Sequence, residues 1–158
     1  MQENRQKLLW WLSVIVPIIL FAFFLRTNEL EHYPAGISND EGSNLIDAFW
    51  FKETGTIPVY EYDNPPEPMY RMILATGMIF FGENVLTVRY TTVLLSMISL
   101  AAGYWMTMQV FADIDRPYRR VIAAFALISL TVMIGHVTLS RALYRAIPMM
   151  TTVSLSVG

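Results

Sequence analysis

Three uncharged apolar runs constrain the fold of this chain more than any other feature of its sequence. They cover residues 8–25, 90–111 and 121–140. An α-helix rises about 1.5 Å per residue, so the shortest run makes a helix of about 27 Å, close to the thickness of a bilayer's hydrocarbon core. The sequence therefore predicts an all-α, polytopic membrane protein with spans at about 8–25, 88–111 and 121–140.

The composition agrees with this prediction and excludes several other classes. Of the 158 residues, 54% are hydrophobic and 15% are charged, whereas roughly 25% are charged in ordinary globular domains. A net charge of −2 argues against nucleic acid as a partner. The absence of cysteine excludes a disulfide framework, a thiolate zinc site and a cysteine nucleophile.

A cleaved signal peptide is the alternative to the first span. Its apolar region is usually about 7–15 residues long and ends in a small-x-small motif. The run at 8–25 is longer, and the sequence FAFFLRTNE that closes it has no such motif. We therefore expect an uncleaved span.

Lysine and arginine predict the orientation. Two basic residues precede the first span and three separate the second from the third: Arg5, Lys7, Arg116, Arg119 and Arg120. The positive-inside rule places both groups, and with them the N-terminus, in the cytoplasm. A multi-pass plasma membrane protein is the default expectation. Because the closing sequence TTVSLSVG looks like the start of a fourth apolar helix, the chain is expected to be the N-terminal part, 1–158, of a longer membrane domain.

The outer loop, 26–87, is predicted to carry two helices on the membrane surface. From Asn44 onward apolar residues follow helical spacing, which predicts a helix at about 39–53. The apolar run at 69–81 is too short to span a bilayer and suits an interfacial helix. Three prolines in the segment 60–68 exclude a helix between them.

Two adjacent acids, Asp40 and Glu41, open the first of these helices. Ser38 followed by Glu41 fits the capping-box pattern, and acids are favoured in a helix's first turn. A structural role therefore explains the pair on local grounds. A catalytic role is the alternative, because both acids lie beside the membrane in a loop expected to pack on its surface.

Three arginines on the outer side are not explained by the positive-inside rule. Arg89 opens the second span, and Arg141 and Arg145 follow the third, one helical turn apart. Each one alone is explained by a side chain reaching the headgroups. Together they are candidates to hold a lipid phosphate.

The segments "NDEGSNLIDAF", "DNPPEPMYRMILATGMIFFGENVLTVRYTTVLL" and "LSRALYRAIPMM" resemble the GT-C type glycosyltransferases that use polyprenyl-phosphate sugars. This group contains the dolichyl-phosphate-mannose–protein mannosyltransferases and the lipid A aminoarabinose transferase (glycosyltransferase family 39 and relatives). The resemblance implies transfer of a sugar, with inversion, from a polyprenyl-phosphate donor to an acceptor hydroxyl on a glycan, lipid or protein at the outer membrane face.

The resemblance also implies residue roles. Asp40 becomes the catalytic carboxylate and Glu41 its companion. Glu67 is a candidate contact to sugar or acceptor, and Arg89, Arg141 and Arg145 are candidates for the donor phosphate. Asn64 departs from the family, since many relatives carry Lys or His before the paired prolines.

No cofactor is required by these patterns, although a divalent cation shared by Asp40 and Glu41 stays open. His32 and His136 are far apart in sequence, and no phosphate-binding loop is present. The alternative function is a non-enzymatic polytopic subunit or a transporter fragment. Transporters usually place ionisable residues within their spans, and within the three uncharged runs His136 alone meets that description.

Overall fold

The computed structural model describes residues 2–56, 68–144 and 146–157, and side chains from Leu9 onward with the exception of Trp10. Within these ranges all regular secondary structure is helical, which confirms the predicted all-α class. The helices are α1 (Gln2–Thr27), α2 (Asn39–Thr54), α3 (Pro68–Phe81), α4 (Val85–Val110), α5 (Arg116–Val132), α6 (Ile134–Arg141) and α7 (Ala146–Val157).

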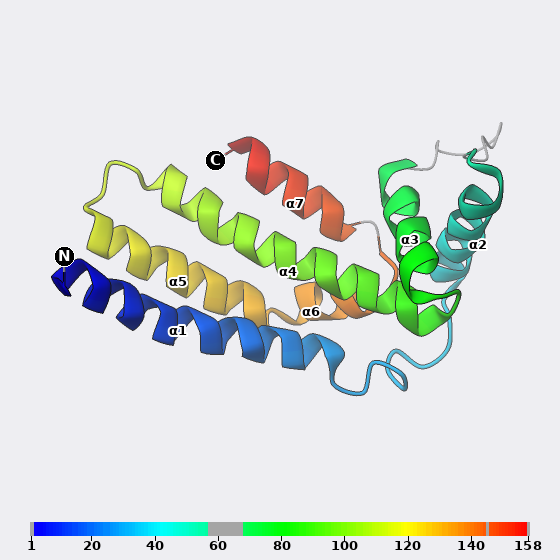
Figure 1. The fold of residues 1–158 in the computed structure, drawn as a ribbon, viewed down its shortest axis with the longest axis horizontal. Coiled ribbons are helices and arrows are strands. Elements are labelled where there is room, and N and C mark those ends of the chain that lie inside the picture. The colour runs from blue at the N-terminus through cyan, green and yellow to red at the C-terminus, as the bar shows by residue number, and fades with distance from the viewer. Residues whose placement is uncertain (1, 57–67, 145, 158) are drawn as a thin grey trace.

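The helices form a long bundle with a crosswise pair at one end (Figure 1). α1, α4 and α5 run side by side along the bundle, and α7 returns along α4. α2 and α3 stand across the bundle end that lies away from the N-terminus and the α4–α5 turn. The basic start of α5 is therefore at the N-terminal end, where the Arg120 guanidinium lies 5.6 Å from the centre of the Trp11 ring. The positive-inside prediction requires the two basic groups to lie at the same end of the bundle, as they do here. Which face of a membrane each end occupies stays a prediction.

One helix, Val85–Val110, is long and apolar enough to cross a membrane, and α5 with α6 counts as a second if that bent pair is one span. The described apolar part of α1, Trp11–Thr27, is shorter than a span. The described residues thus support one or two of the three predicted spans. Large apolar side chains are exposed along the bundle, with Phe125 72% exposed, and a surface of this kind suits contact with lipid.

The predicted span at 121–140 is not one straight helix. It breaks at Met133, and α5 and α6 meet at 58°. In a continuous helix, the carbonyls before position 133 would accept hydrogen bonds from N–H groups of the following turn. The break removes these donors. Arg26 supplies replacements: its Nη1 lies 3.4 Å from the Thr131 carbonyl oxygen and its Nη2 lies 3.4 Å from that of Leu130.

Arg26 also joins two further elements of the bundle, α6 and α4. It is fully buried, and its Nη2 donates to Nδ1 of His136 at 2.9 Å. The other imidazole nitrogen lies 3.4 Å from the Ser99 hydroxyl of α4. A guanidinium has no acceptor, so Nδ1 of His136 must accept, and the ring is neutral. The network connects α1 with α4 and with both halves of the broken helix.

α2 and α3 match the bounds predicted for the two helices of the outer loop to within one residue. They pack on each other and on α4 around an apolar cluster: Ala48, Tyr70, Leu74, Ala75, Met78, Val88 and Leu143. α3 and α4 approach closely at Gly77, where an added Cβ would lie 2.3 Å from the Thr91 hydroxyl oxygen. This close approach fixes the position of α3 beside α4, and with it the position of Arg71.

Candidate functional site

Glu41 completes the predicted capping box at the start of α2. The Ser38 hydroxyl accepts a hydrogen bond from the Glu41 N–H at 3.3 Å, and Oε2 of Glu41 accepts one from the Ser38 N–H at 2.9 Å. These bonds satisfy two N–H groups that a helix start otherwise leaves without partners. The local interpretation of the Ser38–Glu41 pattern is confirmed.

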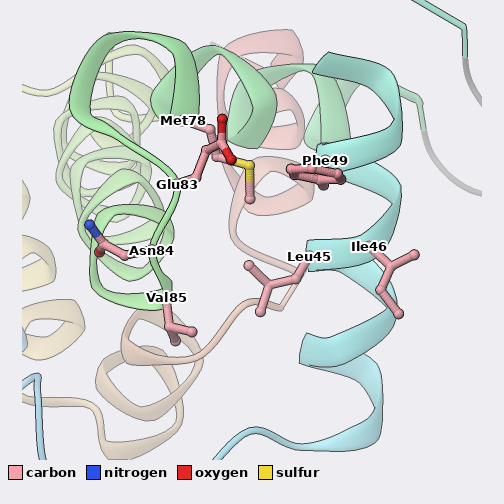
Figure 2. Close-up of a pocket in the computed structure, with 7 residues that line it drawn as sticks. All are labelled: Leu45, Ile46, Phe49, Met78, Glu83, Asn84 and Val85. Carbon is pink, nitrogen blue, oxygen red and sulfur yellow. The ribbon is translucent and has the colours of Figure 1, made fainter. Parts of the chain in front are cut away.

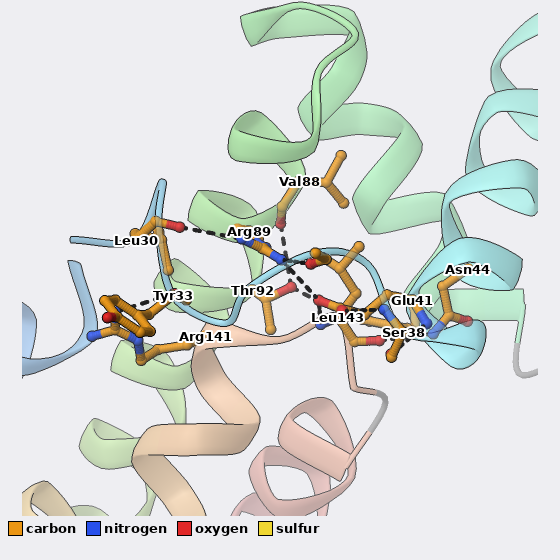
Figure 3. A network of polar contacts seen from close by, with 12 residues as sticks. Leu30, Tyr33, Ser38, Glu41, Asn44, Val88, Arg89, Thr92, Arg141 and Leu143 are labelled. Atoms are coloured by element: carbon orange, nitrogen blue, oxygen red, sulfur yellow. Dashed lines mark hydrogen bonds and ion pairs between the residues drawn. The ribbon is translucent and has the colours of Figure 1, made fainter. Parts of the chain in front are cut away.

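The Glu41 carboxylate also binds a segment 102 residues further along the chain (Figure 3). Its Oε1 accepts from the Leu143 N–H at 3.3 Å. Nδ2 of Asn44, one turn along α2, donates to the Leu143 carbonyl at 2.7 Å. Side chains of α2 therefore hold both polar groups of the Leu143 peptide backbone, and they fix the chain between α6 and α7 against α2. Glu41 is 2% exposed, so its carboxylate acts inside the structure.

Arg89 lies in the same buried network (Figure 3). Its two terminal nitrogens donate to the carbonyls of Leu30 and Gly36, at 3.3 and 2.6 Å, and Nη2 lies 3.7 Å from Oε1 of Glu41. With 4% exposure, the guanidinium ties the loop after α1 to the start of α4. These contacts give Arg89 a structural role, and phosphate binding by Arg89 stays a prediction.

Arg141 caps the end of α1. It donates to the carbonyl of Leu25 at 2.9 Å, and to those of Asn28 and Tyr33 at 2.7 and 3.1 Å. The last carbonyls of a helix have no partner within the helix, and a guanidinium with five fixed N–H donors suits them. The described contacts of Arg141 are thus structural, and its predicted role at a phosphate is not tested by them.

Asp40 differs from its neighbour Glu41 in exposure and in bonding. Its side chain is exposed, and among the described residues no hydrogen bond or ion pair is made by its carboxylate. It lines a small polar pocket of about 180 Å³ together with Ser43, Asn44, Arg71 and Tyr144. Because drug-sized ligands usually occupy about 300–1,000 Å³, this pocket suits a single polar ring or head group.

Arg71 is the cation of this pocket, and a buried acid holds it. Its Nη2 lies 2.8 Å from Oδ2 of Asp47, whose side chain is 2% exposed. Asp40, Ser43, Asn44 and Asp47 are three or four residues apart, so they share one face of α2. Nη1 of Arg71 is buried and has no hydrogen-bond partner among the described residues. A buried donor without a partner is unusual in a native structure and calls for a ligand or water.

The opposite face of α2 borders an apolar groove of about 370 Å³ (Figure 2). α2, α3 and the start of α4 line it with Leu45, Ile46, Phe49, Met78, Glu83, Asn84 and Val85. Lys52 lies nearby and pairs with Glu83 and Glu53, and hydrogen bonds to these two carboxylates raise the pKa of its ammonium. α2 thus separates a polar pocket from an apolar groove.

Comparison with protein-family models, curated proteins and solved structures gives no match. The site is therefore defined by its geometry alone. Of the six predicted site residues, Asp40 lines the polar pocket. Glu41 and Arg89 belong to the buried network beside it, and Arg141 caps the end of α1. Glu67 and Arg145 lie outside the described residues.

The predicted metal possibilities have no counterpart in the described part of the chain. There, no group of three or more His, Cys, Asp and Glu side chains lies close enough to hold an ion. Asp40 and Glu41 diverge, since one is exposed and the other is buried. His136 is packed between Arg26 and Ser99, as expected for a lone histidine in a core.

Sequence reasoning missed the Asp47–Arg71 pair. Arg71 is the single charge in the apolar run 69–81, and Asp47 is an acid within the amphipathic pattern of 39–53. A lone charge on an apolar helix is a signal that a buried partner exists, since an unpaired buried charge is costly. The sequence gives no indication of which acid provides that partner.

Proposed function

We propose that this protein is a membrane glycosyltransferase in which Asp40 acts as the general base. The observation that supports this proposal is the contrast between two adjacent acids. Glu41 is buried in structural bonds, while Asp40 is exposed, makes no bond with the described residues and lines a polar pocket. An unpartnered carboxylate in a pocket with hydroxyl, amide and guanidinium groups can accept a proton from a bound hydroxyl.

The proposed reaction is a single displacement. Asp40 takes the proton of an acceptor hydroxyl, and the oxygen attacks the anomeric carbon of a polyprenyl-phosphate sugar. The bond between that carbon and the phosphate oxygen breaks, and polyprenyl phosphate leaves with the electron pair. Attack from the face opposite the leaving group inverts the anomeric centre. A lipid donor would lie in a membrane. The pocket agrees with this, because it lies on the crosswise helices at one end of the bundle, and the bundle contains α4, the candidate membrane span.

The buried network gives Glu41 a positioning role in this mechanism. It fixes the first turn of α2, on which Asp40 lies, and it fixes the backbone at Leu143, next to the pocket residue Tyr144. The predicted companion of Asp40 thus acts through the backbone. Catalytic groups generally need this kind of rigid support to hold their geometry.

The test is sugar transfer by the full-length protein in detergent or nanodiscs. Asp40→Asn is compared with wild type, using polyprenyl-phosphate sugars, a crude acceptor fraction and a count of released polyprenyl phosphate. We expect Asp40→Asn to lose a factor of about 100 or more, the size of a lost general base. Glu31→Gln, at another exposed acid of the outer loop, is the matched control and should keep the wild-type rate.

Equal turnover by Asp40→Asn and wild type would remove Asp40 from the mechanism. If wild type transfers no sugar from any donor, the non-enzymatic membrane subunit becomes the better description. The capping box and the Glu41–Leu143 bond are the contacts that such a subunit would retain.

A further inference from the structure

The charges around the pocket of Asp40 are unevenly balanced. Asp40 and Asp47 contribute two negative charges and Arg71 contributes one positive charge, so the described groups at the pocket carry a net charge of −1. The 2.8 Å bond to buried Asp47 means that the positive charge of Arg71 is already matched. An anionic ligand would meet the remaining carboxylate of Asp40, and the described residues that line the pocket offer no second cation to offset it.

The hydrogen-bonding groups of the pocket are mixed. Asp40 only accepts hydrogen bonds, Arg71 only donates them, and the hydroxyls of Ser43 and Tyr144 do both. A carboxylate or a phosphate diester has no proton to give to Asp40, so it can use only the donors of the pocket. Sugar hydroxyls donate and accept on neighbouring atoms, so they can use the carboxylate and the guanidinium together.

We infer that the Asp47–Arg71 pair makes this pocket accept a hydroxyl-bearing ring and excludes anions from it. Asp47 is the residue that sets the selectivity, because it converts Arg71 from a cation that attracts anions into a neutralised hydrogen-bond donor. The inference rests on the proposed function in one respect: the bound ring is taken to be the sugar that presents the acceptor hydroxyl to Asp40.

Binding of three ligands with one ring shape and three charges tests this inference. The probes are D-glucose, its anionic relative D-glucuronate and its cationic relative D-glucosamine, each titrated against the full-length protein in detergent and followed by saturation-transfer NMR. Wild type should bind D-glucose and bind D-glucuronate at least about tenfold more weakly, a difference expected for one unscreened charge near the ligand.

Two substitutions should change this preference in opposite directions. Asp47→Asn releases the charge of Arg71, so D-glucuronate should gain roughly tenfold relative to D-glucose. Arg71→Gln removes the cation, so D-glucosamine should gain by a similar factor. Asp47→Glu keeps the negative charge and is the matched control; it should keep the wild-type order. Arg71→Gln provides an independent outcome if Asp47→Asn does not fold, and circular dichroism identifies that case.

Preferred binding of D-glucuronate by wild type would overturn the inference, and so would a preference that neither substitution changes. Absence of D-glucose binding at tens of millimolar would also overturn it. These results are separable from sugar transfer. Binding with the expected charge pattern but no transfer refutes the proposed function alone, whereas transfer with the opposite pattern refutes this inference alone.

Discussion

The contrast between Asp40 and Glu41 makes a sharp stability prediction, because two adjacent acids on one helix turn should respond oppositely to the same change. Glu41→Ala removes one of the two bonds of the capping box, the one that the Ser38 N–H donates to the Glu41 carboxylate, worth about 0.5–1.5 kcal/mol. It also leaves the buried Leu143 N–H without its partner, at a cost of about 1–3 kcal/mol. The two losses together place the expected destabilisation near 3 kcal/mol.

Asp40→Ala should cost far less. The Asp40 carboxylate is exposed and makes no bond with the described residues, so only its favourable interaction with the helix dipole is lost, about 0.3–1 kcal/mol. For a chain of this size 1 kcal/mol corresponds to about 2–4 °C in Tm. Glu41→Ala should therefore lower Tm by about 6–12 °C, and Asp40→Ala by at most about 4 °C.

Thermal unfolding of the two variants and wild type in one detergent, followed by tryptophan fluorescence, measures both shifts. Glu41→Gln is an informative third variant, since it keeps one carbonyl oxygen as an acceptor and should fall between wild type and Glu41→Ala. Equal shifts for the two alanine variants, or a larger one for Asp40→Ala, would refute the division of roles between a buried positioning acid and an exposed reactive acid.

Three further predictions concern the packing of the fold. Gly77→Ala should lower the free energy of unfolding by about 1–3 kcal/mol, because its Cβ would collide with Thr91. Gly42→Ala meets only an ordinary contact, so its free energy of unfolding should be unchanged or rise by up to about 1 kcal/mol. Urea unfolding compares the two variants. Burial raises the pKa of the Tyr70 phenol, so the unfolded chain loses this proton first and stability should fall as pH rises above about 10. Tyr70→Phe should remove that part of the alkaline loss in a pH series of melting curves. Arg26→Leu leaves two carbonyls at the α5–α6 break without donors and should cost about 2–6 kcal/mol, visible as a lower Tm.

Much of the fold follows from local sequence patterns. Helical spacing of apolar residues predicts α2 and a short apolar run predicts α3, each to within one residue. The Ser38–Glu41 pattern predicts the cap at the start of α2. The apolar run at 90–111 corresponds to α4, which starts a few residues earlier because Asn84 caps it through a bond to the Thr87 N–H. These features depend on residues that are close together in the sequence, so local sequence patterns predict them.

The break at Met133 depends on a distant residue and was not predicted. Residues 121–140 contain no proline, and their composition alone suits an uninterrupted span. The bend is stabilised by Arg26, more than a hundred residues away, whose position next to the carbonyls is known only from the packing of α1 on α5.

The same limit applies to the site. Asp40 and Glu41 are chemically similar and adjacent, so no local pattern separates a buried acid from an exposed one. Leu143 makes the distinction, because its N–H lies where Glu41, and not Asp40, can reach it. Arg71 was overlooked for a related reason: its partner Asp47 lies on another helix, and only the α2–α3 packing brings the two together.

The buried guanidinium of Arg26 has a consequence for motion. Broken helices inside membrane proteins often present free carbonyls that coordinate a mobile ion, and the ion's arrival and departure allow the two half-helices to move. Here the positive charge at the break is covalently attached to α1 and is fixed further by His136. It cannot exchange with solvent, so the bend between α5 and α6 is held by a side chain of the protein itself, and the chain that borders the pocket follows from that bend.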